Sequence, residues 1–461
     1  MRTLLFSIAL LFSGLAASSQ QTLTMEEFLS LVKKYHPVAK QASLGVEVAK
    51  AEVTSARGGF DPTFQNSISR KELDGLLYYD HQISEVKVPT WYGVDVVAGI
   101  ESLTGQRTSD PDTKGNSSYF GFSVPVAKGL LMDARRAALQ QANIFQQLSV
   151  QEQRTIINNL LFEAAKAYWT WWQQYQVQVL FRQAIKNAEQ RFRLVKTAFQ
   201  IGERPAIDTV EALAQLQSFQ ISANELQLEV TNAQLDVNVF LWQENGEVYS
   251  LPQVVTPQQQ MPALLENMQM DKLLQSVQLH PDLQQYRFKL EALQVEKRLK
   301  FQSLLPSVYL KYNQLNKSHS LQKSFNTPWL KNNYRYGIAV SIPLRLSEGR
   351  GEYRKAKLKI EQTELQQLNK QVSLQTKLRQ YYNEWKQLRE QIALQRQAVQ
   401  SYITLQRGEE IKFANGESSL FLMNARELKT LEAQQKLIEL QGKEQKAVAS
   451  TLWAAGVLIA E

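Results

Sequence analysis

Residues 191–214 read RFRLVKTAFQIGERPAIDTVEALA, and residues 405–426 read LQRGEEIKFANGESSLFLMNAR. Both stretches carry the pattern Phe-x-x-Gly-Glu, with its glycine at Gly202 and again at Gly416. Glycine suits a sharp reversal between two helices because its backbone adopts a positive φ at little cost. The two stretches therefore predict two helical hairpins that turn at Gly202 and Gly416.

The helix that precedes each turn is expected to be very long. Residues 130–201 contain neither Gly nor Pro, and residues 352–407 are their counterpart. At 1.5 Å per residue the first run would reach roughly 100 Å as one helix. Ordinary globular helices average about 11–12 residues, so helices of this length are not expected inside a compact domain. Additional apolar residues flank the apolar seam of the first run, which indicates neighbouring helices on two sides.

The matching turns belong to a larger internal repeat. His36-Pro37 recurs as His280-Pro281, Ser123 to Val126 recurs as Ser341 to Leu344, and Leu241-Trp242 recurs as Leu452-Trp453. Because the order of the pairs is kept, the chain is interpreted as two copies of one unit. The predicted boundaries are 20–242 for the first repeat, 243–262 for a connector rich in Gln and Pro, and 263–461 for the second repeat.

Four segments show the alternation of apolar and polar residues that is typical of a strand with two different faces. They are residues 92–101, 117–126, 307–313 and 334–344. Strands of about ten residues, with one apolar face and aromatic residues near the ends, match the wall of a transmembrane barrel. The first repeat also has about 26 additional residues near 71–89, around the turn signal Asp74-Gly75. This insertion could be an extracellular loop, a plug or an extra hairpin.

The first 19 residues have the features of a secretory signal peptide. Arg2 supplies a positive charge, residues 4–15 are mostly apolar, and Ala16 to Ser19 offer small residues for cleavage. No later stretch reaches the roughly 18 apolar residues of a membrane helix, so any crossing would be made by strands. The chain is therefore expected to be exported.

Composition argues against other classes of function. The net charge of +8 comes from Lys and Arg mixed with Glu and Gln along the 461 residues, which favours a solvated helix surface over nucleic-acid binding. The chain has no Cys and four His, and no catalytic, metal or cofactor motif is present. His36 and His280 fit helix starts, and Trp169, Trp171 and Trp172 fit core packing. We therefore expect no enzyme, no cofactor and no bound metal.

On these residues the mature chain resembles the outer membrane efflux protein (TolC) family. The resemblance rests on the duplication, the two His-Pro pairs, the strand that ends in Val/Ile-Pro before each long helix, and the two turn motifs. It implies an α+β membrane protein with a duplicated helix–strand–strand–long helix–helix unit. Three protomers with four strands each would form a 12-stranded transmembrane β-barrel, followed by a long periplasmic α-helical barrel.

The resemblance also implies the function and the partners. The homotrimer would be the exit duct of a tripartite efflux pump or a type I secretion system. It would sit in the lipid of the outer membrane of a Gram-negative bacterium and conduct small molecules or polypeptides passively. An inner-membrane pump would supply the energy through a periplasmic adaptor protein. The alternative is a periplasmic coiled-coil adaptor or scaffold without a pore, and the four alternating segments argue against it.

By the same resemblance the two turns form the periplasmic mouth and dock the adaptor. The docking residues would be Gly202, Glu203, Arg204 and Pro205 in the first repeat, and Gly416, Glu417, Ser418 and Ser419 in the second. Asp208 stands where the family has an acidic gate residue, whereas Phe421 and Asn424 stand where the second repeat would carry acidic ones. We therefore expect a gate closed in part by an apolar side chain that excludes water.

Overall fold

A computed structural model describes residues 22–106, 113–252, 254–259, 261, 268–326 and 328–458. The predicted signal peptide lies outside the described residues. The chain forms two compact units, and each of them combines segments of both predicted repeats. The helical unit comprises residues up to 40, 157–276 and from 375 onward, and the sheet unit comprises 41–156 and 277–374. The division of the sequence into two repeats stays a prediction.

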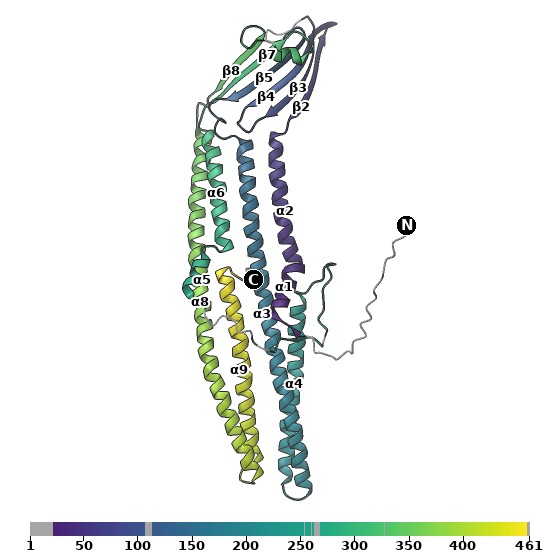
Figure 1. The fold of residues 1–461 in the computed structure, drawn as a ribbon, viewed down its shortest axis with the longest axis vertical. Coiled ribbons are helices and arrows are strands. Elements are labelled where there is room, and N and C mark those ends of the chain that lie inside the picture. Colours follow the sequence, from purple (N-terminus) through teal and green to yellow (C-terminus); the bar gives the residue numbers. More distant parts are fainter. Residues whose placement is uncertain are drawn as a thin grey trace, which may run out of the picture. The chain divides into compact units, whose positions relative to one another are not determined.

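Two helices are as long as the sequence predicts (Figure 1), and each has residues in both units. They are α3 (Ala134–Gln200) and α8 (Ser347–Ala414). In the helical unit, α4 (Ala206–Asn238) lies beside the second half of α3, and α9 (Leu420–Ala455) lies beside the second half of α8. The predicted hairpins at Gly202 and Gly416 are therefore confirmed. Within the described residues, no helix is both long and apolar enough to cross a membrane.

The helical unit also has shorter elements, some of which surround an aromatic core. They are α1 (Met25–Tyr35), α5 (Met270–Val277), and a parallel pair of short strands, β1 (Thr22–Leu23) and β6 (Thr256–Pro257). Of this pair, β6 lies in the described part of the predicted connector. Trp169, Trp171 and Trp172 are almost completely buried, and Trp172 donates from its indole nitrogen to the carbonyl oxygen of Gln258 at 2.9 Å. The prediction that these tryptophans belong to the core is confirmed.

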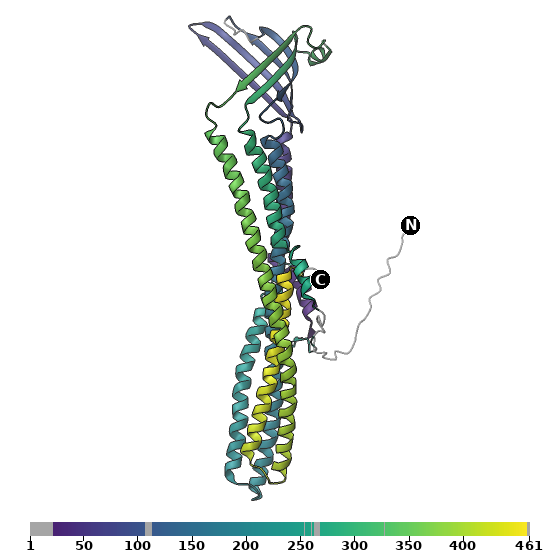
Figure 2. The same cartoon turned by 90° about the vertical axis from the view of Figure 1, so that its left-hand side faces the viewer.

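The sheet unit holds one antiparallel sheet of six strands in the order β2-β3-β4-β5-β7-β8 (Figure 1). Figure 2 shows the same strands after a turn of 90°. The strands are β2 (Thr63–Leu73), β3 (Leu76–Pro89), β4 (Asp95–Thr104), β5 (Gly115–Pro125), β7 (Ser307–Asn316) and β8 (Tyr334–Ser341). The helices α2 (Pro37–Arg57) and α6 (Pro281–Gln302), the 3-10 turn η1 (Gly58–Phe60) and the short α7 (Leu321–Asn326) complete this part of the chain.

The sheet corrects the predicted number of strands. The four predicted segments correspond to β4, β5, β7 and β8, but the chain contributes six strands to the sheet. The additional pair, β2 and β3, is the insertion near 71–89 together with the residues before it. Asp74 and Gly75 form the turn with φ of 52° and 74°, a combination that joins two antiparallel strands tightly. Among the three possibilities for the insertion, the structure shows an extra hairpin.

The histidines before proline begin helices, as predicted. The Nδ1 atom of His36 accepts a hydrogen bond from the backbone N–H of Val38 at 3.2 Å, and Nδ1 of His280 accepts one from Asp282 at 3.1 Å. Burial lowers the pKa of His36, which favours the neutral ring that can accept such a bond. Each histidine thus satisfies an N–H group that the first turn of a helix leaves without a partner.

Candidate functional site

The first tip, residues 202–205 between α3 and α4, is a tight turn that leaves its backbone exposed. Gly202 has a φ of 81°, its N–H donates to the carbonyl oxygen of Phe199 at 3.0 Å, and the N–H of Glu203 donates to that of Ala198 at 2.9 Å. This pair of bonds ends a helix when the last residue adopts the left-handed conformation. Pro205 then precedes the first residue of α4.

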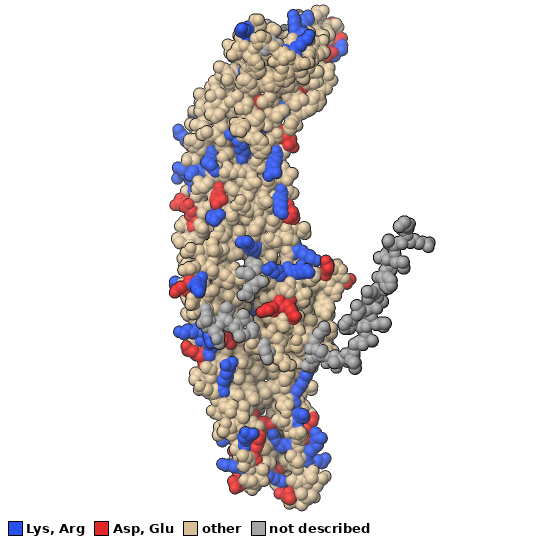
Figure 3. Space-filling model, in the orientation of Figure 1, with Lys and Arg blue, Asp and Glu red and all other residues tan. Residues whose placement is uncertain are grey.

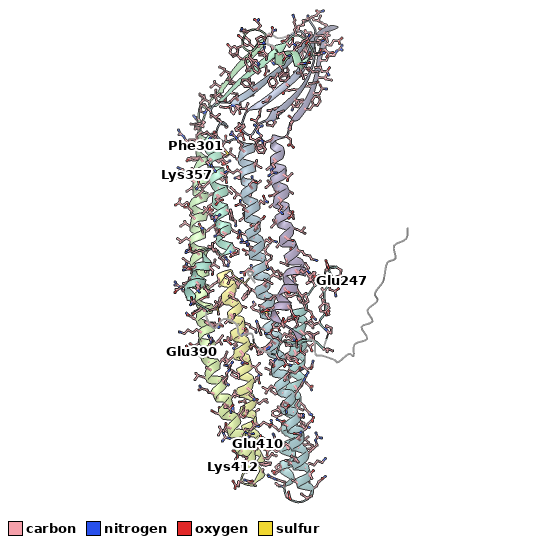
Figure 4. All side chains as sticks on the ribbon, viewed as in Figure 1. Glu247, Phe301, Lys357, Glu390, Glu410 and Lys412 are labelled. Atoms are coloured by element: carbon pink, nitrogen blue, oxygen red, sulfur yellow. The ribbon has the colours of Figure 1, made fainter. Side chains whose placement is uncertain are left out.

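The second tip, residues 416–419 between α8 and α9, repeats the same backbone geometry. Gly416 has a φ of 78°, and its backbone N–H donates to the carbonyl oxygen of Phe413 at 3.1 Å. The backbone N–H of Glu417 donates to the carbonyl oxygen of Lys412 at 2.9 Å. Lys412 is labelled in Figure 4 near the end of α8. Ser419 begins α9, because its hydroxyl accepts from the N–H of Leu422 at 3.3 Å. The two predicted tips therefore share one backbone design.

Side chains join the two tips to one another. Arg204 extends from the first tip to the end of α8, where Nη2 donates to the carbonyl oxygen of Phe413 at 3.2 Å. Its guanidinium lies over the Phe413 ring, 4.0 Å from the ring centroid. The Nη1 atom of Arg204 also lies 3.5 Å from Oδ2 of Asp208. Asp208, predicted as the acidic gate residue, thus contacts Arg204 within the first hairpin, and Arg204 makes the contact with the second hairpin.

The two residues predicted for the gate on α9 have different surroundings. Phe421 is 67% exposed, so its ring is free to meet solvent or another molecule. Asn424 is only 6% exposed; its Oδ1 accepts from Nη1 of Arg191 at 3.0 Å and its Nδ2 donates to Oε1 of Glu211 at 3.3 Å. The structure therefore brings Asn424 into the interior of the bundle and leaves Phe421 on its surface.

Arg191 is the centre of a polar cluster that the sequence alone did not reveal. Its guanidinium binds the Glu427 carboxylate through two bonds, Nη1 to Oε2 at 2.5 Å and Nη2 to Oε1 at 2.7 Å. Only 13% of the Arg191 side chain and 7% of the Glu427 side chain are exposed. We call Arg191, Glu211, Asn424 and Glu427 the buried polar cluster; it joins α3, α4 and α9. Apolar residues of the same helices, such as Val195 and Leu420, are buried nearer the tips.

The sheet has one apolar and one polar face. Outside the end of the β2–β3 hairpin, where the register shifts after Lys71, even-numbered residues pair with one another and share one face, which includes Phe64, Val86, Val96, Phe122 and Ile338. Away from the upper rim, the side of the sheet seen in Figure 3 carries few charged side chains. Odd-numbered residues share the other face, which is polar and charged and includes Glu85, Lys87, Asp95, Lys311 and Arg335. A cavity of about 460 Å³ lies against this polar face.

The model of the outer membrane efflux protein family matches residues 29–239 and 273–456. The chain belongs to this family. It is therefore an outer-membrane protein that serves as an exit duct for efflux. The family consists of outer-membrane efflux proteins and not of enzymes, in line with the prediction that this chain is not an enzyme. The alternative of an adaptor without a pore is set aside.

Solved structures of outer-membrane proteins share the fold of this efflux protein. The Campylobacter jejuni CmeC channel is 15% identical, with 94% of this chain and 85% of that chain covered and a TM-score of 0.64. VceC of Vibrio cholerae is 14% identical over 94% and 96% of the two chains, with a TM-score of 0.64. The open MtrE channel of Neisseria gonorrhoeae is 13% identical over 94% and 88%, with a TM-score of 0.63. No curated protein matches the sequence.

Proposed function

We propose that three copies of this efflux protein form one closed conduit through which cargo passes passively. An inner-membrane pump of a tripartite or type I secretion system supplies the energy and reaches the conduit through a periplasmic adaptor. One observation carries the proposal: the sheet has an apolar face, a polar face and two edges that no described strand pairs with, so the described part of a single chain does not enclose a pore. Unpaired backbone groups at such edges cost several kcal/mol each in lipid.

The surface of α4 supports the ring independently of the sheet. Ile207, Ile221, Leu228 and Leu235 recur at multiples of seven residues, and each is more than half exposed. Ala214 occupies the remaining position of the series. Residues spaced seven apart lie close to one line along a helix, so these exposed apolar side chains form a narrow seam that a neighbouring helix can cover. The partner that fits this seam is a helix of a second copy.

The conduit is tested by its conductance. The mature protein, extracted from outer membranes with detergent and added to planar bilayers, is expected to form discrete ion-conducting channels. Cells that lack the gene are expected to become more sensitive to exported toxic compounds, and the unmodified gene should restore resistance. A protein that inserts into bilayers but never conducts would contradict the proposal.

We assign adaptor docking to the two tips, because they lie at helix reversals and most of their residues, Glu203 and Glu417 among them, are exposed. A photo-crosslinking amino acid at Glu203 or Glu417 is expected to give an adduct with the adaptor in living cells. The same amino acid at Glu390 is the matched control, because Glu390 is also exposed and lies on α8 about 36 Å from the end of this helix at Ala414. Equal adducts at all three positions would contradict a docking role of the tips.

The exposed ring of Phe421 supports an apolar gate at the mouth. In a ring of three copies, three such rings would narrow the opening and exclude water without binding cations. Phe421→Ala is expected to raise the conductance of the closed channel several-fold in planar bilayers. Leu422→Ala is the control, since Leu422 is exposed but points to a different side of α9. An unchanged conductance in Phe421→Ala would exclude this gate, with Asp208 and Asn424 then acting only as structural contacts.

A further inference from the structure

The two edges of the sheet have the same character. β2 pairs only with β3, and β8 pairs only with β7. Phe64 and Ile68 on β2, and Tyr336, Ile338 and Val340 on β8, are largely exposed. No described residue pairs with the outer edge of either strand. Long apolar edges with free N–H and C=O groups are templates for pairing with another chain.

The directions of the edge strands allow copies of the chain to pair with one another. All five pairings in the sheet are antiparallel, and the number of strands is even. The two edge strands, β2 and β8, therefore run in opposite directions. When β8 of one copy lies beside β2 of the next, the alternation continues without a break. An odd number of strands would have forced a parallel pair at each junction.

The extra hairpin is built into the wall of the sheet. β3 pairs with β4 over ten residues, from Asp80 opposite Thr104 to Pro89 opposite Asp95. Tyr119 on β5 reaches across β4 and donates from its hydroxyl to Oε2 of Glu85 on β3 at 2.6 Å. The ring crosses β4 at Gly99, where a Cβ atom would lie only 2.5 Å from it. This side-chain contact spans three strands and fixes β3 as a member of the wall.

The extra hairpin also continues both faces of the sheet. Phe64 and Ile68 on β2 lie on the apolar face, in register with Val86 and Gln82 on β3. The opposite side of the hairpin carries Gln65, Ser67, Glu85 and Lys87 toward the polar face. A hairpin with one apolar and one polar face suits a position between lipid and water. Neither a plug nor a surface loop requires this alternation.

From these features we infer that the conduit has 18 strands, six from each of three copies, closed by three junctions between β8 of one copy and β2 of the next. This inference rests on the ring proposed above and departs from the four strands per chain that the family resemblance implied. Because barrel diameter grows roughly linearly with the number of strands, the opening is about half again as wide as that of a 12-stranded barrel. The partner at each edge is a second copy of this chain.

The junction is testable by disulfide cross-linking, because the chain contains no cysteine of its own. Ile338→Cys on β8 is combined, one at a time, with Phe64→Cys, Asn66→Cys, Ile68→Cys or Arg70→Cys on β2. These four positions lie on the same face as Ile338. Gln65→Cys, Ser67→Cys and Ser69→Cys are matched controls on the opposite face. Each variant is oxidised in isolated outer membranes and separated on gels without reducing agent, and only variants that form the normal amount of oligomer are compared.

The expected result is a covalent trimer for one or two neighbouring positions among the four, and none for the three controls, since partners across a sheet lie on the same face. Cross-links from Ile338→Cys to Val96→Cys, Ala98→Cys or Ile100→Cys on β4, with none to β2, would overturn the inference. In that case the extra hairpin lies outside a wall of 12 strands, and the proposal that three copies form a ring remains supported. A chain that stays monomeric in the membrane would contradict the ring.

Hydrogen exchange of the unmodified protein gives a second test that does not depend on any variant. In the closed barrel, the N–H groups of β2 that point away from β3 are bonded to β8 of the neighbour. Peptides from β2 are then expected to be as strongly protected as peptides from β4, which has neighbours on both sides. Exchange of about half of the β2 amides within seconds, with β4 protected, would overturn the junction.

Discussion

The two helix tips share a backbone and differ in their side chains. At both tips, a glycine adopts the left-handed conformation, and its backbone N–H donates to the carbonyl oxygen three residues earlier. The backbone N–H of the following glutamate donates to the carbonyl oxygen five residues earlier. At the first tip, Arg204 reaches over to the other hairpin, whereas the second tip has serines and leaves Phe421 exposed. The difference teaches that the chain reversal is a local property of each hairpin. The connection between the hairpins depends instead on side chains: Arg204 on Phe413, the buried polar cluster, and apolar residues such as Val195 and Leu420 that pack together near the tips.

The largest expected effect comes from the buried polar cluster. Arg191→Ala would leave the Glu427 carboxylate buried without its partner, and such a loss costs about 3–5 kcal/mol. We expect a large drop in the melting temperature of the detergent-extracted oligomer. Arg193→Ala is the control, because Arg193 is 73% exposed and lies 3.8 Å from Glu189, so its loss should cost less than about 1 kcal/mol. Similar melting temperatures for both variants would show that the hairpins do not depend on the cluster.

The glycines test whether the two turns are equivalent. Gly202→Ala and Gly416→Ala each force a Cβ atom into the left-handed conformation, which costs roughly 1–2 kcal/mol. A Cβ atom at either position would meet no other atom within 4 Å, so the cost is conformational and should be equal at the two tips. Gly408→Ala, inside α8, should instead stabilise the helix by up to about 1 kcal/mol. The measurement is again thermal melting, and clearly unequal losses at the two tips would break the comparison.

The smallest of the three effects concerns Arg204. Arg204→Gln removes the stacking on Phe413, and such a contact contributes about 0.5–1 kcal/mol near a surface. In a double-mutant cycle with Phe413→Leu, the two losses should add to more than the loss of the double variant. Strict additivity would mean that the ring and the guanidinium do not stabilise one another. In that case the contact of Arg204 with the Phe413 ring would give the first tip no stabilising role that the second tip lacks.

The sequence predicts what depends on neighbouring residues. The long helices follow from stretches without Gly or Pro, the turns follow from Gly202 and Gly416, and four strands follow from their strict alternation. The sequence does not predict that β2 and β3 belong to the wall, because Asn66 and Arg70 interrupt the apolar face of β2. Its turn at Asp74-Gly75 was visible, but a turn does not reveal what the hairpin pairs with.

The side-chain contacts that join the two hairpins near the tips cannot be predicted in the same way. Arg191 and Glu427 are separated by 236 residues, and the sequence has many other charged residues on helices of similar pattern. Only the packing of α3 against α9 selects this pair and excludes water from it. The place of Asn424 in the repeat predicts a gate residue but not its partners, and the fold turns its amide toward Arg191 and Glu211. Position within a repeat fixes the backbone of a site more firmly than the direction of a side chain.

The central claim is that one copy of this chain is an incomplete wall that closes only in a ring. Native mass spectrometry of the unmodified protein, released from outer-membrane extracts under conditions that keep assemblies intact, tests this claim most directly. The account predicts a single dominant species with the mass of three mature chains. A dominant species with the mass of one chain, from membranes in which the protein is still active in efflux, would contradict it.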